Sequence, residues 1–194
     1  MAAFVTQPAP QFKADALVDG QFKEVALSDF KGKKVVLFFY PLDFTFVCPT
    51  EILAFSDAKA EFDARNTVVL GVSVDSKFSH WAWTQMERKE GGIKGITYPL
   101  VSDLNKTIAQ DYGVLLSAGV ALRGLFIIDA DDKQTIRHIT INDLPLGRNV
   151  EEAQRLLDAI DFSNEHGEVC PANWKKGDKA MTPTFDGLKA FSSK

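Results

Sequence analysis

The sequence predicts an α/β fold built on a mixed sheet. Two short, continuous apolar runs, residues 35–40 ("VVLFFY") and 68–74 ("VVLGVSV"), have the length and composition of buried central strands. Segments with helical periodicity follow both runs. Two pairs of strand-like segments joined by short polar turns add antiparallel hairpins, so we expect strands of both directions in one sheet flanked by helices.

The strands are expected at regular intervals along the chain. An Asp19-Gly20 pair is a strong signal for an N-terminal hairpin. A second hairpin brackets the acidic turn "DADDK" and is expected at one edge of the sheet. The expected strands or extended segments are residues 11–18, 21–27, 35–40, 68–74, 97–101, 124–130 and 134–141.

Helices are predicted by apolar residues at helical spacing and by capping residues. Pro49 suits the first turn of a helix whose apolar stripe runs from Ile52 to Phe62. Asp75 or Ser76 can cap the next helix. Two further helices are expected from about residue 103 to 112 and from 149 to 160.

The chain of 194 residues fits one domain with a tail. Periodicity fades after residue 160, and the remainder is rich in Gly, Pro, Lys and Ser. We therefore expect a domain at residues 1–162 and an irregular C-terminal arm at 163–194.

Charge and hydropathy exclude some classes of partner. The net charge is −4 without a block of like charges, which argues against nucleic acid as a partner. The N-terminus lacks the pattern of a secretory signal, and no apolar run is long enough to span a bilayer. We expect a cytoplasmic protein without a membrane partner, in a compartment where cysteine pairs tend to be catalytic or transient.

The chain has two cysteines, Cys48 and Cys170, and neither belongs to a CxxC. Its three histidines are scattered, so we expect no metal site. Cys48 precedes Pro49 at a predicted helix start, where unpaired N–H groups and the helix dipole favour a thiolate. Thr45, three residues earlier, has a hydroxyl within reach of the sulfur or a bound substrate. A buried structural cysteine before a helix would have the same spacing.

Four separated motifs resemble those of the peroxiredoxins. Pro41, Thr45 and Cys48 in "PLDFTFVCPTE" resemble the family's P-x-x-x-T-x-x-C active-site motif, and "EVCPANW" around Cys170 is similar to the resolving segment of the typical two-cysteine subgroup. The segments "GVALRGLFIID" and "INDLPLGRN" resemble those that carry two further site residues of the family, here Arg123 and Arg148. The resemblance extends from about residue 11 to residue 174.

The resemblance implies a thioredoxin-like fold and reduction of hydrogen peroxide and alkyl hydroperoxides without a cofactor. It makes Cys48 the nucleophile, Thr45 and Arg123 the donors that stabilise the departing oxygen, and Pro41 a shield for the sulfenic acid. Cys170 is implied to form a disulfide with Cys48 of another subunit, in a homodimer that assembles into a decameric ring. Thioredoxin is the implied reductant, with a dedicated flavoprotein or thioredoxin-like reductant as alternatives.

Glu51 lies three positions after Cys48 and is expected to orient Arg148 or Arg123. The alternative is a surface or interface ion pair between Glu51 and Arg148. The sequence alone leaves both open.

Two departures from the family concern overoxidation. Peroxide-sensitive members have a G-G-L-G loop and a C-terminal Tyr-Phe, which cover the folded site. Here residues 91–94 are "GGIK" and residues 190–191 are "AF". We expect easier local opening, faster disulfide formation and a relatively robust enzyme.

Two other functions compete with the peroxidase. A holdase chaperone is one alternative, because rings of this family bind unfolded clients and that activity does not need Cys48. A thioredoxin-like disulfide reductase is disfavoured, because Thr45 stands where a CxxC has its first cysteine.

Overall fold

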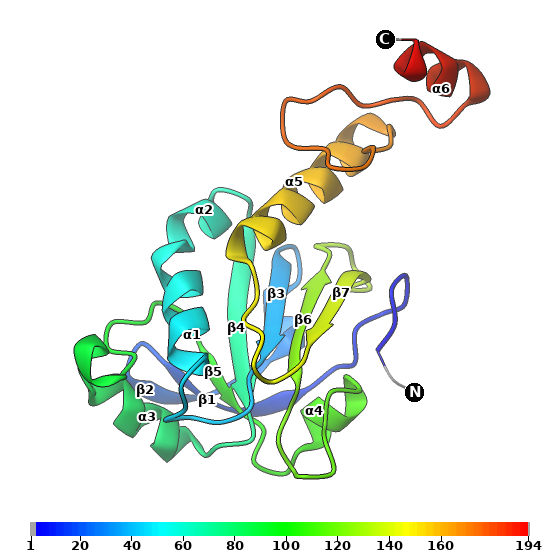
Figure 1. The fold of residues 1–194 in the computed structure, drawn as a ribbon. Coiled ribbons are helices and arrows are strands. Elements are labelled where there is room, and N and C mark those ends of the chain that lie inside the picture. The colour runs from blue at the N-terminus through cyan, green and yellow to red at the C-terminus, as the bar shows by residue number, and fades with distance from the viewer. Residues whose placement is uncertain (1–2, 194) are drawn as a thin grey trace. The chain divides into compact units, whose positions relative to one another are not determined.

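The computed structural model describes residues 3–193. Residues 1 and 2 of the predicted domain and residue 194 of the predicted C-terminal arm lie outside the described residues. The described residues form a seven-stranded sheet in the order β2-β1-β5-β4-β3-β6-β7 (Figure 1). Its strands are β1 (Lys13–Val18), β2 (Gln21–Ala26), β3 (Lys34–Phe39), β4 (Thr67–Ser73), β5 (Leu100–Ser102), β6 (Arg123–Ile128) and β7 (Ile136–Asn142). The predicted mixed α/β sheet is confirmed.

The three central strands run parallel, and hairpins complete both edges. β4 pairs in parallel with β3 and with β5. On one side β6 pairs antiparallel with β3 and with β7; on the other, β1 pairs antiparallel with β5 and with β2. Asp19 and Gly20 have φ of 51° and 73°, as a two-residue hairpin turn of type I′ requires. Sequence predicted a hairpin at one edge, whereas the N-terminal hairpin also joins this sheet.

The helices are α1 (Cys48–Asp57), α2 (Lys59–Asp63), α3 (Lys77–Gln85), α4 (Thr107–Asp111), α5 (Val150–His166) and α6 (Phe185–Ser192), with two 3₁₀ turns, η1 (Leu27–Phe30) and η2 (Arg88–Glu90). The predicted stripe from Ile52 to Phe62 is divided between α1 and α2. The helix expected from about residue 103 is shorter, because the Asp103 carboxylate accepts the N–H groups of Ile108 and Ala109 from outside it.

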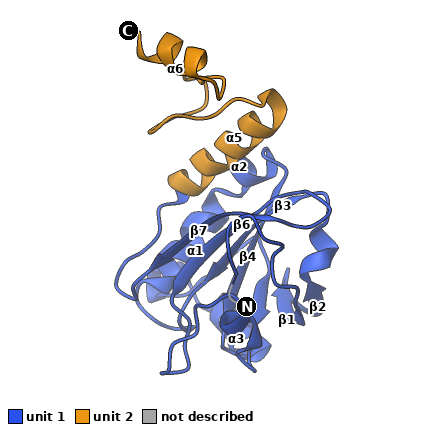
Figure 2. Ribbon diagram, turned by 90° about the vertical axis from the view of Figure 1, so that its right-hand side faces the viewer, with its two compact units in different colours: residues 1–150 blue, residues 151–194 orange. Residues whose placement is uncertain are grey.

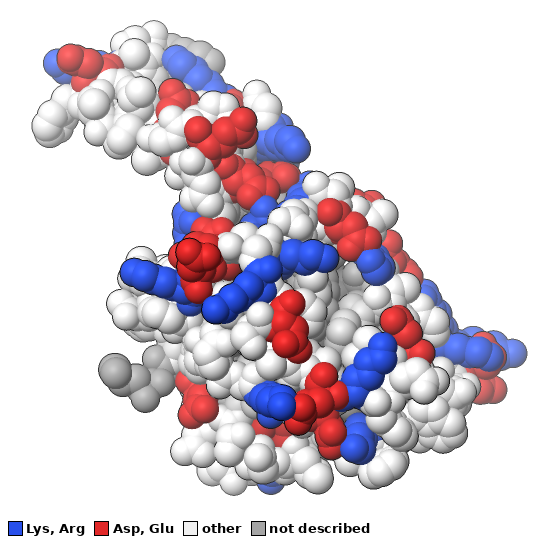
Figure 3. Space-filling model, turned by 180° about the vertical axis from the view of Figure 1, so that it is seen from behind, with Lys and Arg blue, Asp and Glu red and all other residues white. Residues whose placement is uncertain are grey.

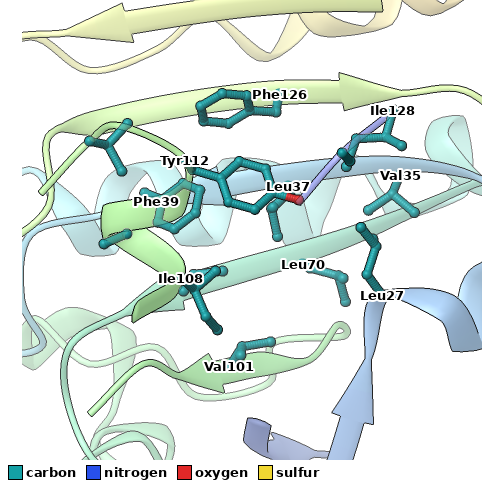
Figure 4. Close-up of a cluster of buried hydrophobic side chains, with 14 of the residues drawn as sticks. Leu27, Val35, Leu37, Phe39, Leu70, Val101, Ile108, Tyr112, Phe126 and Ile128 are labelled. Carbon is teal, nitrogen blue, oxygen red and sulfur yellow. The ribbon is translucent and has the colours of Figure 1, made fainter. Parts of the chain in front are cut away.

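β3 is buried on both faces, as expected of a central strand. On one face Phe39 packs against Tyr112 and Phe126, with ring centroids 5.3 and 5.8 Å away (Figure 4). The preceding side chain, Phe38, points to the other face and stacks on Phe55 of α1 at 4.7 Å. The segment that follows β3 therefore leaves from a rigid, doubly covered strand.

The chain divides into two compact units, residues 1–150 and 151–194, which Figure 2 colours separately. The second unit holds nearly all of α5 together with the C-terminal arm. The boundary that the sequence predicts between domain and arm, at residues 162–163, stays a prediction. Within this unit Trp174 is buried against Phe162 of α5 at 5.1 Å. The arm also forms a helix, α6, whose first turn is capped by the Thr184 hydroxyl on the N–H of Gly187.

The surface carries both signs of charge. On the face drawn in Figure 3, lysine and arginine side chains alternate with aspartate and glutamate, and neither sign gathers into an extended patch. Among the described helices, none combines the length and the apolar composition that crossing a membrane requires.

Candidate active site

Cys48 is the first residue of α1, and its side chain is fully buried. Pro49 takes the second position, where a missing N–H costs nothing because first-turn N–H groups have no partner inside the helix. Val47 precedes the helix, and its carbonyl accepts the N–H groups of Thr50 (3.1 Å) and Glu51 (3.3 Å). The thiol thus lies at the positive end of a helix dipole, the position expected from the sequence.

Arg123 is the side chain that the fold brings to this thiol from far along the chain. It is the first residue of β6 and 3% exposed. Its Nη1 atom lies 3.4 Å from Cys48 Sγ and 2.7 Å from Glu51 Oε2. Its Nε atom donates to the carbonyl of Leu144 at 2.6 Å, which fixes the plane of the guanidinium. A permanent positive charge therefore directs a donor at the sulfur.

Glu51 is shared by two buried arginines. Its Oε1 atom accepts from Arg148 N (2.8 Å) and Nε (2.7 Å), and its Oε2 atom accepts from Arg148 Nη2 (2.9 Å) and from Arg123. Its side chain is 2% exposed, so this is a buried network rather than a surface ion pair. One carboxylate between two guanidiniums leaves one net positive charge, which an anionic sulfur at Cys48 would balance.

Arg148 is fixed by contacts that its spacing in the sequence does not reveal. Its Nη1 atom donates to the carbonyls of Phe39 and Gly124, both at 2.7 Å. Its guanidinium lies over the Phe38 ring, 5.0 Å from the centroid, which is cation–π distance. These partners lie near the ends of β3 and β6. Because Arg148 also binds Glu51 of α1, it joins the sheet to the helix that carries Cys48.

Pro41 and Thr45 lie on the segment between β3 and α1. Pro41 is buried, and Thr45 is half-buried. The Thr45 hydroxyl donates to the carbonyl of Leu42 at 3.0 Å, so its proton is engaged there rather than on the sulfur. Its oxygen still has lone pairs that can accept a hydrogen bond from a substrate O–H. The sequence led us to expect Thr45 as a donor to the substrate, whereas in this structure its hydroxyl donates to the Leu42 carbonyl.

The segment between β3 and α1 is anchored by a buried network that the motifs did not reveal. Asp43 accepts from the Tyr40 hydroxyl at 2.9 Å and lies 2.9 Å from Nδ1 of His80, whose side chain is fully buried. The N–H of Asp43 donates to Asp75 Oδ2 at 2.9 Å. Burial, and secondly the charge of Asp43, raises the pKa of Asp75; burial raises the pKa of Tyr40 well above its usual value. The only signal in the sequence was polar residues beside an apolar run.

Cys170 belongs to the other compact unit. It is a partly exposed free thiol, and its Sγ atom lies 3.7 Å from the carbonyl of Ala159 on α5. Burial raises the pKa of the Cys170 thiol, while the charge of Arg155 opposes that rise. Cys48 is also a free thiol, so a bond between the two cysteines stays a prediction. Among residues 3–193, no cluster of three or more His, Cys, Asp or Glu side chains has a metal-binding arrangement.

Comparisons with known proteins agree over the whole chain. A family model described as the AhpC/TSA family matches residues 5–139, and one described as the C-terminal domain of 1-Cys peroxiredoxin matches residues 159–194. A thioredoxin peroxidase of Echinococcus granulosus is 57% identical over 194 residues, which is 100% of both chains. Peroxiredoxin-2 of Bos taurus is 58% identical over 99% of this chain and 96% of its own length.

A solved structure matches over nearly the whole chain as well. The reduced 2-Cys peroxiredoxin of Plasmodium vivax superposes with a TM-score of 0.96 at 45% identity, over 99% of this chain and 100% of that one. The fold and site thus define a thioredoxin-like protein with a buried thiol beside paired arginines. The chain belongs to the AhpC/TSA family and is a peroxiredoxin of the typical two-cysteine type. The resemblance found in the sequence motifs is confirmed.

Proposed function

We propose that Cys48 is the nucleophile with which this thiol-dependent peroxidase reduces hydrogen peroxide and alkyl hydroperoxides. The observation that carries the proposal is the 3.4 Å approach of Arg123 Nη1 to the Cys48 sulfur at the start of α1. The names of the relatives, thioredoxin peroxidase and peroxiredoxin, support this activity and do not favour the chaperone alternative.

In the first half of the cycle the Cys48 thiolate attacks the terminal oxygen of the peroxide. A sulfur–oxygen bond forms, the O–O bond breaks, and the departing oxygen takes a proton and leaves as water or an alcohol. Sulfur is oxidised to sulfenic acid, and the peroxide receives the electron pair. Negative charge moves from sulfur to the leaving oxygen, so donors are needed at both positions.

The neighbouring residues have complementary roles in that step. Arg123 has N–H groups for both the sulfur and the departing oxygen, and Glu51 and Arg148 hold it in place. The Thr45 oxygen accepts the O–H of the bound peroxide and so orients its O–O bond. Pro41 is a buried residue of the segment between β3 and α1 and keeps water from the sulfenic acid.

In the second half, Cys170 attacks the sulfenic sulfur of Cys48 of another subunit. A disulfide forms and the sulfenic oxygen leaves as water. Thioredoxin then returns both cysteines to thiols; a dedicated flavoprotein or thioredoxin-like reductant is the alternative. The name of the Echinococcus granulosus relative, thioredoxin peroxidase, supports thioredoxin. A reducing compartment such as the cytoplasm suits a cycle that starts from two free thiols.

The proposed assembly is a homodimer that builds a decameric ring. Large apolar side chains remain exposed in the first unit: Phe44 is 52% exposed, Phe46 94% and Phe78 62%. Exposed apolar surface of this kind supports contact between copies of the chain. Sedimentation velocity of the reduced protein measures the assembly directly, and a monomer at micromolar concentration would contradict it.

The function is tested by adding one equivalent of hydrogen peroxide to the reduced protein and separating the products on a non-reducing gel. We expect rapid loss of both thiols and a covalent dimer that is absent from Cys48→Ser and Cys170→Ser. Coupling to thioredoxin, thioredoxin reductase and NADPH should then give continuous turnover. Retention of both thiols after peroxide addition would overturn the proposal.

A further inference from the structure

Arg155 on α5 is bound at three points inside the second compact unit. Its Nε and Nη2 atoms contact the two carboxylate oxygens of Glu152 at 2.6 and 2.8 Å, a bidentate pair one turn apart on the helix. Its Nη1 atom donates to the main-chain carbonyl of Trp174 at 2.9 Å. The guanidinium is therefore held in one plane and directed at the segment that follows Cys170.

That segment is folded back on α5 around Trp174. The indole is 2% exposed, packs against Phe162 and donates to the carbonyl of Asp178 at 3.1 Å. The N–H of Trp174 bonds the carbonyl of Pro171 at 3.1 Å, which closes a turn immediately after Cys170. Packing of Trp174 on α5 therefore also holds Cys170 close to that helix. Arg155 of α5 supplies a hydrogen bond to the Trp174 carbonyl.

The geometry also places the Arg155 charge near the Cys170 sulfur. The sulfur lies 3.7 Å from the carbonyl of Ala159, four residues after Arg155 and therefore on the same face of α5. Burial raises the pKa of the Cys170 thiol, and the positive charge of Arg155 acts in the opposite direction. Three of the five N–H groups of the Arg155 guanidinium have the partners described above.

Other charged groups near this turn have their own partners. Asp158, on the next turn of α5, lies 4.0 Å from Lys176 Nζ. Asp178 accepts the N–H of Lys175 at 2.9 Å.

We propose that Arg155 is a positioning residue for disulfide formation: fixed by Glu152, it holds the Cys170 turn through the Trp174 carbonyl and keeps a positive charge beside the Cys170 sulfur. This inference rests on the proposed role of Cys170 as the resolving thiol. In that step Cys170 first loses its proton. The sulfur–sulfur bond then forms as the sulfur–oxygen bond of the sulfenic acid breaks, and the oxygen leaves as water. Arg155 favours the thiolate from which this step starts.

The proposal is tested on Cys170 as the sole thiol, in a Cys48→Ser background. The rate of alkylation by iodoacetamide is measured against pH for this protein and for versions that also carry Arg155→Met or Arg155→Lys. We expect Arg155→Met to move the midpoint upward by about half a pH unit, equal to about threefold less thiolate at neutral pH. Arg155→Lys should keep most of the thiolate, because it keeps the charge. Arg65→Met, a substitution in the other unit, is the matched control.

The lysine variant separates charge from docking, since lysine lacks the fork that bonds Glu152 at two points. If the alkylation midpoint moves upward equally in the methionine and lysine variants, only the docking role of Arg155 remains. That result would overturn the proposed effect of its charge. A methionine variant with the midpoint of its parent, or a lower one, would also overturn it.

A second readout uses the protein with both cysteines. After one equivalent of peroxide, Arg155→Met should form the disulfide about threefold more slowly at pH 7, while Cys48 is oxidised at an unchanged rate. The difference should disappear only when the pH exceeds the raised pKa of the Cys170 thiol. If the unsubstituted protein forms no disulfide, the proposed function fails. The alkylation experiment remains decisive for Arg155 in that case, because it needs neither peroxide nor Cys48.

Discussion

Glu51 is the carboxylate around which the buried side chains of the site are arranged. It neutralises one of two guanidiniums, and together they leave a single positive charge at the Cys48 sulfur. Removing either arginine would leave two anions, the carboxylate and the thiolate, with a single compensating positive charge in a low-dielectric interior. The residues of the site act as a unit, so the effects of substituting them are not expected to be additive.

Arg123→Met should lower the second-order rate constant for hydrogen peroxide by about 100- to 1,000-fold, the usual effect of losing a donor to a developing oxyanion. Stopped-flow fluorescence under pseudo-first-order conditions measures the rate. Arg88→Met is the control, because Arg88 pairs with Asp57 at the exposed surface. A rate for Arg123→Met within threefold of the unsubstituted protein would show that Arg123 does not act on the reacting atoms.

The active-site segment between β3 and α1 is the element that decides the position of Thr45. It leaves β3 at Tyr40 and is tied to β4, α3 and β5 through Asp43, His80 and Asp75. Phe44 takes a positive φ of 56°, a strained conformation that persists only when surrounding contacts impose it. The anchor therefore holds a strained backbone directly before the helix that carries Cys48.

Asp43→Ala should lower the free energy of unfolding by about 3 kcal/mol, since it leaves Tyr40 and His80 buried without their carboxylate. The peroxide rate should fall by about 10- to 100-fold, because small displacements of the segment misplace Thr45. Urea denaturation and stopped-flow kinetics measure the two effects, with Asp57→Ala as the exposed control. Reduced stability at an unchanged peroxide rate would assign the anchor to folding alone.

The loop at residues 91–94 is a second element with a testable consequence. Lys94 stands where peroxide-sensitive members have the last glycine of the loop. Its side chain pairs with Glu87, and its carbonyl accepts from Arg88 Nε at 3.1 Å. We expect Cys48 to resist conversion to sulfinic acid. The double substitution Lys94→Gly and Ala190→Tyr should reduce that resistance severalfold, because it slows the local opening that precedes disulfide formation. Mass spectrometry of Cys48 after turnover at rising peroxide measures it. Heavy sulfinic acid at micromolar peroxide in the unsubstituted protein would refute the expectation.

At the scale of the whole molecule, the two cysteines lie in different compact units. The proposed cycle joins Cys48 of one subunit to Cys170 of another. Mixing Cys48→Ser with Cys170→Ser after subunit exchange provides a direct test, because no single chain then holds both thiols. We expect peroxide to produce a covalent dimer in the mixture and in neither variant alone. An oxidised unsubstituted protein that migrates as a monomer would indicate an intrachain bond instead.

Much of the chemistry was predictable because it depends on local spacing. The sequence alone determined that Cys48 stands at a helix start, since Pro49 and the helical stripe are local signals, and that β3 is central, since residues 35–40 are apolar throughout. It also placed an N-terminal hairpin at Asp19-Gly20, because the turn requires those backbone angles. Four motifs in order then specified the family.

Only the tertiary structure decided which side chains meet. Arg123 lies 75 residues from Cys48 and Arg148 lies 97 residues from Glu51, and their distances depend on how β6 pairs with β3. The carbonyls of Phe39, Gly124 and Leu144 are invisible to sequence reasoning, because every residue has one and only the fold selects which face a guanidinium. The same holds for Asp43 and His80, and for Arg155 and the carbonyl of Trp174. Local chemistry identifies the thiol, whereas packing and strand register supply the charges around it.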